Sequence, residues 1–198
     1  MIRKQLRPAI LLTFVFIVVT GLVYPGIVTA VAKVVFPDQA SGSLVTHNGQ
    51  VVGSRLIGQQ FAEPWYFHPR LSAAGNGYDA TASGGTNKGP TDRKLADTLI
   101  AGAIAQAESA GVPKGKIPTD MATTSASGLD PHISPANALY QVARVAAARG
   151  VDSSRVRDLA LHYVEARQFG FFGEPRVNVL ALNLALDSAF PLPASARK

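Results

Sequence analysis

The chain has 198 residues, with 19 lysine and arginine side chains against 13 aspartate and glutamate side chains and a formal net charge of +6. Four of the basic residues precede Asp38 and no acidic residue does, so residues 38–198 carry 15 basic and 13 acidic side chains. Nucleic-acid binding needs clustered cations that meet phosphates, and this near-neutral part excludes such a partner. The absence of cysteine excludes a disulfide framework, thiol catalysis and thiolate metal sites.

The N-terminal segment predicts one membrane-spanning helix. No charged residue interrupts residues 8–32, and roughly 20 apolar residues are enough for a helix to cross a bilayer core of about 30 Å. Arg3, Lys4 and Arg7 precede the run and place the N-terminus in the cytoplasm. We therefore predict a single-pass protein of the cell inner membrane. Its parts are a cytoplasmic basic tail at 1–7, a transmembrane helix at 8–36 and an extracytoplasmic α+β domain at 37–198.

A cleaved signal peptide is the competing interpretation of this segment, because residues 30–32 read Ala-Val-Ala and fit a small-residue cleavage site. An apolar signal region covers only about 7 to 15 residues, whereas this run continues to Phe36. The length favours an uncleaved anchor. Both interpretations export the rest of the chain.

Small residues recur along the apolar run at spacings that allow close approach of helices in lipid, although such residues are common in any membrane helix. Pro25 is expected to kink the helix because proline lacks the backbone N–H. We predict packing against other membrane helices through Ala9, Thr13, Thr20, Gly21, Gly26 and Ala30.

Short strands and turns are predicted for residues 40–70. Asn48-Gly49 stands between two apolar stretches and is a strong hairpin signal. A cluster of aromatic residues follows at 61–67, and then a polar stretch rich in glycine, serine and threonine at 71–91. A loop of that length in a folded domain is usually functional or mobile.

Helices are predicted for the remainder. Thr91 or Asp92 caps the first, which ends near residues 111–113. Ser134 with Pro135 begins the second, which ends at Gly150. A third starts after Asp152, and the segment from 177 onward forms a last helix or a strand followed by a helix.

Motifs for catalysis are absent from the sequence, which has neither a phosphate-binding Gly-Lys-Ser/Thr loop nor a Gly-x-Ser-x-Gly elbow. The four histidines lack metal-ligand spacing, so we predict no catalytic residues and no metal site. A hydrolase that uses Ser127 with His132 remains a remote alternative. The segment 123–141 reads as a connection that caps a helix, or as an anion site at the same helix N-terminus.

Several blocks of the sequence resemble the KdpC family, the single-span C subunit of the bacterial Kdp potassium-transporting P-type ATPase. They are "GSRLIGQQF" (53–61), "YFHPRLSA" (66–73), "YDATASGGTNKGPT" (78–91), "TSASGLDPHISPANALYQVARVAAARG" (124–150) and "GEPRVNVLALNLALD" (173–187). The resemblance covers the chain from about Arg7 to Asp187. Leu71 and Lys88 depart from the usual family pattern.

The resemblance implies a non-catalytic accessory subunit of a high-affinity potassium uptake complex. Its partners would be a potassium-conducting subunit, a P-type ATPase subunit, a small single-span subunit and membrane lipid. The family is described as a catalytic chaperone that raises the ATP affinity of the pump subunit, and the resemblance attributes nucleotide contact to Gln141. ATP would then enter through the complex, with no cofactor bound by this chain itself.

Direct nucleotide binding conflicts with the predicted orientation, because an exported domain lies away from cytoplasmic ATP. We therefore expect an external role that supports assembly, with any effect on ATP affinity being allosteric. A direct nucleotide-binding regulator is the alternative. Candidate partner contacts are Trp65, Tyr66, Phe67, His68, Tyr78, Gly84 and Gly85, which could equally be core aromatics beside a mobile loop.

Overall fold

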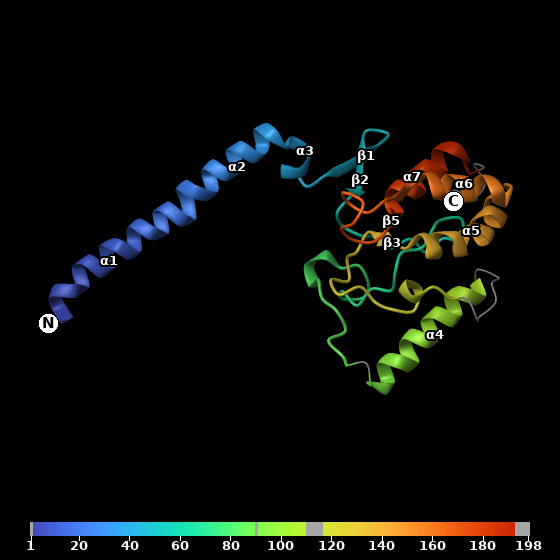
Figure 1. Ribbon diagram of the computed structural model, residues 1–198, viewed down its shortest axis with the longest axis horizontal. Helices are drawn as coiled ribbons and strands as arrows, with labels where there is room; N and C mark the ends of the chain where they lie inside the picture. The colour runs from blue at the N-terminus through green and yellow to red at the C-terminus, as the bar shows by residue number, and fades with distance from the viewer. Residues whose placement is uncertain (1, 90, 110–116, 193–198) are drawn as a thin grey trace. The chain divides into compact units, whose positions relative to one another are not determined.

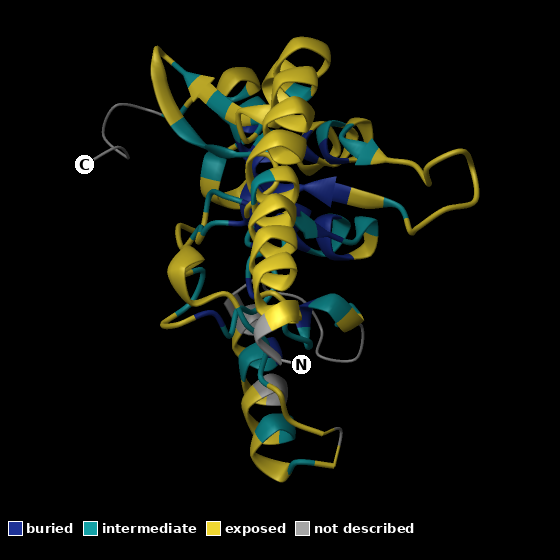
Figure 2. Cartoon of the chain, turned by 90° about the vertical axis from the view of Figure 1, so that its left-hand side faces the viewer, coloured by how far each residue is buried: buried dark blue, intermediate teal, exposed yellow. Residues whose placement is uncertain are grey.

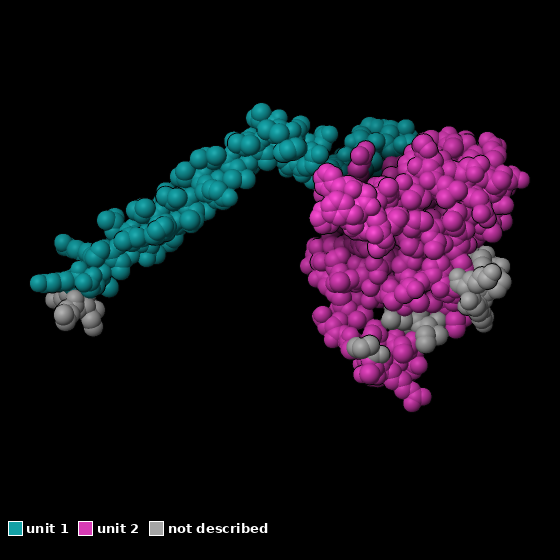
Figure 3. All heavy atoms as spheres, viewed as in Figure 1, with its two compact units in different colours: residues 1–52 teal, residues 53–198 magenta. Residues whose placement is uncertain are grey.

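A long apolar helix begins the chain in the computed structural model, which describes residues 2–89, 91–109 and 117–192 (Figure 1). The chain divides into two units, Met1–Val52 and Gly53–Lys198 (Figure 3). In the first unit, the helix consists of α1 (Ile2–Val18), a π-helical turn η1 (Val19–Val23) and α2 (Tyr24–Val35).

The stretch Lys4–Val35 of this helix has 32 residues and is long and apolar enough to cross a membrane. The prediction of one N-terminal helix of spanning length is confirmed. Helical structure already begins at Ile2, inside the predicted tail 1–7. The membrane boundaries at 8 and 36 and the orientation stay predictions.

Pro25 lies in the first turn of α2 without ending the helix. The turn before it is the π-helical one, in which the Tyr24 N–H donates to the Val19 carbonyl. A proline ring crowds the carbonyl four residues earlier, and a wider turn relieves that crowding. The irregularity expected at Pro25 as a kink is therefore observed as a π-helical turn.

The short helix α3 (Pro37–Ala40) leads to a hairpin of β1 (Leu44–His47) and β2 (Gln50–Ser54). Its two turn residues, Asn48 and Gly49, have φ angles of 50° and 78°. A two-residue turn with both residues left-handed matches the right-handed twist of the strands. The predicted hairpin is confirmed.

The second unit is built on a three-stranded antiparallel sheet with the order β3-β5-β4. Val177 in the central strand pairs with Ile133 on one side and Val164 on the other. Three helices adjoin the strands in the chain: α5 follows β3, α6 precedes β4, and α7 follows β5 directly. The bounds are β3 (His132–Ile133), α5 (Pro135–Arg149), α6 (Ser153–His162), β4 (Val164–Glu165), β5 (Arg176–Asn178) and α7 (Val179–Ala189).

The core is formed by residues of β3, β5, α5, α6 and α7 together with Phe67, and Figure 2 shows buried residues in dark blue. Helix α5 contributes an apolar stripe to this core, and α7 contributes one of its faces. The fully or nearly fully buried residues of the core are Phe67, Ile133, Ala138, Val142, Val145, Ala146, Val156, Ala160, Val177, Val179, Leu182 and Leu186.

The helix ends follow the capping chemistry of the sequence. Ser134 Oγ accepts a hydrogen bond from the Asn137 N–H at 3.0 Å at the start of α5. Gly150 ends that helix with φ of 64°, a left-handed conformation that glycine adopts without strain. Asp152 caps α6 through the Ser154 N–H at 2.7 Å. These three predicted boundaries are confirmed.

The helix α4 (Arg93–Ser109) is also capped as predicted, because Asp92 Oδ1 accepts from the Leu95 N–H at 2.7 Å. Ala103 on its apolar face is buried. The predicted end near residues 111–113 lies outside the described residues. Two single 3-10 turns, η2 (Ala80–Ala82) and η4 (Thr119–Met121), stand before and after this helix.

Candidate functional site

A short segment, residues 64–68, is held against α5 and α7 by side chains in place of a neighbouring strand. Gln141 on α5 binds both backbone groups of His68: Oε1 accepts from the N–H at 2.7 Å and Nε2 donates to the carbonyl at 2.9 Å. Asn183 on α7 binds Phe67 in the same way, at 2.8 and 3.0 Å. Each amide thus supplies the pair of hydrogen bonds that a neighbouring strand would exchange.

Gln141 uses its whole hydrogen-bonding capacity inside the fold. Its Oε1 also accepts from Arg144 Nη2 at 2.6 Å, and its Nε2 also donates to Asn137 Oδ1 at 2.8 Å. An amide has two donors and two acceptor sites, and all four are occupied. The side chain is 0% exposed. The residue to which nucleotide contact was attributed therefore lies beneath the surface.

Two arginines of α5 hold the same segment by its carbonyl groups. Arg144 donates to the Pro64 carbonyl and, at 3.0 Å, to the Tyr66 carbonyl. It is 7% exposed, and burial lowers its pKa to about 10, so it remains cationic at neutral pH. Arg149 Nε donates to the Trp65 carbonyl at 2.8 Å. Together with the two amides, these guanidinium groups fix the backbone of 64–68 along its length.

The aromatic rings of the segment are oriented as well. Tyr66 donates its hydroxyl to Asp187 Oδ2 at 2.8 Å, and Arg149 Nη2 pairs with the other carboxylate oxygen at 2.7 Å. The Tyr66 ring lies edge-on to Phe61 with 5.5 Å between centroids, and Trp65 lies 6.5 Å away. Trp65 and Tyr66 stay half-buried, so they present a rigid aromatic surface.

The other two predicted contacts in this segment differ in position. Phe67 is 0% exposed and belongs to the core, from which it supports the surface residues. His68 is half-buried, and its Nε2 lies 2.9 Å from the Glu63 carbonyl. Burial, with the nearby charge of Arg144, lowers the pKa of His68. Contact of any of these residues with a partner stays a prediction.

The predicted loop 71–91 is tied to the segment that precedes β3. Ser72 Oγ donates to the Gly128 carbonyl at 2.6 Å and accepts from the Tyr78 N–H at 2.8 Å. The Tyr78 hydroxyl donates to the Arg70 carbonyl at 2.5 Å, and burial raises its pKa. Tyr78 is therefore anchored inside the loop with only part of its ring exposed.

Gly84 and Gly85 lie where the two segments meet. The Gly84 N–H donates to the Ser127 carbonyl at 2.9 Å. A Cβ at Gly85 would lie 2.9 Å from the Ala126 carbonyl oxygen, closer than real Cβ contacts allow. Glycine at this position permits the close approach of the two backbones. A role of these glycines in partner contact stays a prediction.

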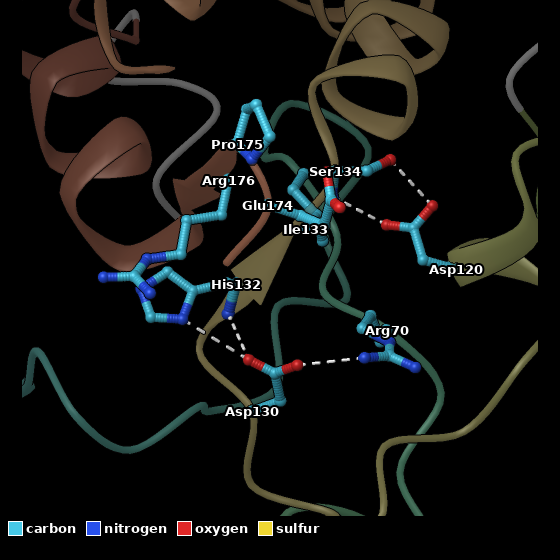
Figure 4. Close-up of a pocket in the computed structure, with 9 residues that line it drawn as sticks. All are labelled: Arg70, Asp120, Asp130, His132, Ile133, Ser134, Glu174, Pro175 and Arg176. Atoms are coloured by element: carbon cyan, nitrogen blue, oxygen red, sulfur yellow. Dashed lines mark hydrogen bonds and ion pairs between the residues drawn. The ribbon is translucent and has the colours of Figure 1, made fainter. Parts of the chain in front are cut away.

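A shallow hollow of about 360 Å³ is lined by charged side chains of both signs, among them Arg70, Asp130 and Arg176 (Figure 4). Asp130 lies between Arg70, which donates from Nη1 at 3.0 Å, and His132, whose N–H donates at 3.0 Å. Partial burial raises the pKa of Asp130, but the hydrogen bonds from His132 and Arg70 outweigh it and lower the pKa overall. The carboxylate is thus ionised and already paired.

The N-terminus of α5 is occupied by a carboxylate of the chain itself. Asp120 accepts from the Ser134 N–H at 2.7 Å, from Ser134 Oγ at 2.8 Å and from Asn137 Nδ2 at 3.0 Å. A negative charge at this position is stabilised by the unpaired N–H groups and dipole of the helix. The anion is therefore internal, which favours the structural interpretation of residues 123–141 over a ligand site.

The described residues give no support to the hydrolase alternative or to a metal centre. Ser127 Oγ lies 3.1 Å from Ser125 Oγ and accepts from the Leu129 N–H, whereas His132 Nδ1 lies 3.4 Å from Asp130. No hydrogen bond joins Ser127 to His132, so a nucleophile with its base is not formed. Across the part of the chain that the structure describes, no group of three or more acidic or histidine side chains could hold a metal ion.

The small residues predicted to pack in the membrane helix are all exposed along its surface, so their packing against other helices stays a prediction. They are Ala9, Thr13, Thr20, Gly21, Gly26 and Ala30.

We did not predict from the sequence that arginine and asparagine side chains hold residues 64–68. A signal existed, because Asn137, Gln141 and Arg144 put polar groups at helical spacing beside the apolar stripe of α5. Buried polar side chains at such positions need partners.

Comparison with known proteins gives consistent matches over nearly the whole chain. The family model described as KdpC, "K+-transporting ATPase, c chain", matches residues 6–188. A potassium-transporting ATPase KdpC subunit of Koribacter versatilis is 55% identical over 192 residues, 96% of this chain and 98% of that protein. A protein of the same description from Gemmatimonas aurantiaca is 52% identical, over 98% of this chain and 98% of that protein. One from Rhodospirillum rubrum is 51% identical, over 96% of this chain and 98% of that protein.

Proposed function

This chain belongs to the KdpC family, and we propose that it is a non-catalytic accessory subunit of a high-affinity, ATP-driven potassium uptake complex. In this proposal the chain stabilises the assembly of the potassium-conducting subunit with the P-type ATPase subunit. Hydrolysis of ATP and conduction of potassium belong to those partners. A small single-span subunit completes the complex.

One observation carries the proposal: in the residues that the structure describes, one apolar helix of spanning length precedes a folded domain. The helix has no charged residue between Pro8 and Ala32. Ion pathways through membranes need polar or charged groups that replace the hydration shell, so this helix serves as an anchor. Arg3, Lys4 and Arg7 before it favour a cytoplasmic N-terminus and an exported domain.

The alternative, a regulator that binds nucleotide directly through Gln141, is disfavoured by the burial of that side chain. A nucleotide would have to displace bonds to His68, Asn137 and Arg144 before it reached the amide. Any effect on the ATP affinity of the pump therefore acts through contacts with partner subunits that differ between states of the pump. Such coupling needs a rigid contact surface.

The aromatic surface of Trp65 and Tyr66 fits that requirement. Buried side chains fix its backbone, so little conformational entropy is lost when a partner binds. Aromatic side chains also carry a large share of the energy at protein interfaces. We propose that this surface contacts a partner subunit, and that Tyr78, Gly84 and Gly85 of loop 71–91 also take part in partner contact.

Native gel electrophoresis of membranes in mild detergent tests the proposal. We expect the chain to migrate with the pump subunits, and a Trp65→Ala variant to release part of it to the position of the isolated chain. Arg157→Ala, an exposed change on α6, is the matched control and should migrate as the wild type does. Migration of the wild-type chain alone would contradict an accessory role in this complex.

A further inference from the structure

The loop between β4 and β5 carries three exposed phenylalanine rings at its end. Phe169, Phe171 and Phe172 are 87%, 65% and 58% exposed. All residues from 165 to 174 are exposed, and the segment extends away from the sheet (Figure 2). Large apolar side chains gathered in this way on a surface mark an interaction site.

The loop has a defined backbone. Gln168 and Phe172 exchange two hydrogen bonds of 2.9 Å, which close a tight turn. Within that turn Phe169 has φ of 53° and Gly170 has φ of 82°. A left-handed conformation is unfavourable for a bulky residue, and asparagine or glycine is the usual choice there. The turn therefore holds its most exposed phenylalanine at a conformational cost, which a purely connecting turn would avoid.

The charges of the loop lie at its base and cancel. Arg167 pairs with Glu174 at 2.5 Å, and Arg176 pairs with Glu165 at 2.9 Å. The residues between them, 168–173, carry no charge. The result is an uncharged apolar tip above two ion pairs. Such a tip can enter an apolar medium while its charged groups of both signs remain at a polar boundary.

We propose that this phenylalanine tip, residues 168–173, inserts into the headgroup and acyl boundary of the lipid bilayer. The proposal rests on the membrane anchorage described under the proposed function. A chain that carries a spanning helix holds its folded domain close to a bilayer, so insertion of the tip is an intramolecular event at high effective concentration. A few aromatic side chains are then sufficient, because the helix already supplies the main affinity.

Lipid fits the tip better than an anionic or basic partner does. The neutral tip provides no charge to complement a charged protein surface or nucleic acid. Amphipathic segments that lie in the membrane boundary present aromatic and aliphatic side chains to the acyl chains, as this tip does. The tip would be a second membrane contact that restricts rotation of the domain about its anchor.

Fluorescence of the full chain in liposomes tests the proposal. The chain has one tryptophan, so a Trp65→Phe background allows a single probe to be placed. Phe171→Trp puts that probe on the tip, and Leu161→Trp, at a site 47% exposed on α6, is the matched control. Liposomes are made from phosphatidylcholine and phosphatidylglycerol, with or without bromine on the acyl chains of the phosphatidylcholine. Circular dichroism is used to check that both variants fold.

We expect the probe at 171 to emit at shorter wavelength than the probe at 161. We also expect brominated liposomes to lower the intensity of the probe at 171 and not that of the probe at 161. Equal intensity of the 171 probe in both kinds of liposome would overturn the proposal. If that emission shifts only when the pump subunits are added, the tip binds protein and lipid insertion is wrong. Because these liposomes contain no partner, quenching can succeed or fail independently of co-migration with the pump.

Discussion

Replacement of Gln141 by leucine separates a structural role from a nucleotide-binding role at this position. Leucine has a similar size but no hydrogen-bonding groups, so the change leaves the backbone N–H and carbonyl of His68 without their partners. Each buried polar group that is left without a hydrogen-bond partner lowers the free energy of unfolding by about 1–3 kcal/mol. We expect the two groups together to lower the free energy of unfolding by about 2–6 kcal/mol. For a domain of this size the melting temperature would fall by roughly 5–20 °C.

Asn183→Leu is the matched control, because Asn183 makes the same pair of bonds to Phe67 from α7. The assay has two parts: thermal unfolding of each full-length variant in detergent by circular dichroism, and the KM for ATP of the assembled pump. Both variants should lower the melting temperature to a similar extent. They should also change the KM for ATP to the same extent, or leave it unchanged. A Gln141→Leu chain that unfolds like the wild type while it alone raises that KM would refute the reasoning.

Two further predictions concern backbone geometry and pH. Gly150→Ala should lower the free energy of unfolding by about 1–2 kcal/mol, because it places a Cβ on a left-handed residue in open space. Gly128→Ala should lower it by about 1–3 kcal/mol more, because the added Cβ would also lie 2.6 Å from Ala74 Cβ. Equal urea midpoints for the two variants would contradict this packing. His68 has a lowered pKa, so the unfolded chain binds its proton more readily and stability is lost as the pH falls below about 6.5. Between about pH 7.5 and 5.5, the melting temperature of His68→Gln should therefore fall by less than that of the wild type. An equal fall in both proteins would show that His68 does not titrate as described.

Local chemistry explains which parts of the fold were predictable from the sequence. The Asn48-Gly49 turn and the Ser134-Pro135 helix start each depend on residues within a few positions of one another, and both are present as predicted. The apolar run of the first helix needs only its own composition. These features are set by backbone conformations and by solvent, so no distant residue is required to specify them.

The arrangement around residues 64–68 could not be predicted in the same way. Gln141 and His68 are 73 positions apart in the chain, and Asn183 and Phe67 are 116 apart. Polar side chains with helical spacing indicate that partners are needed, but not which backbone supplies them. The exposed phenylalanines at 169–172 were missed for a related reason: a short apolar run predicts burial as readily as exposure.

Labelling of single cysteines in intact cells tests most directly whether the folded domain lies outside the cytoplasm. The chain contains no cysteine, so Arg157→Cys on the exposed side of α6 and Lys4→Cys before the apolar run each give one thiol. With a membrane-impermeant maleimide, we predict labelling at 157 in intact spheroplasts and labelling at 4 only after lysis. The reverse pattern, with 4 labelled in intact spheroplasts and 157 protected until lysis, would contradict an external accessory subunit.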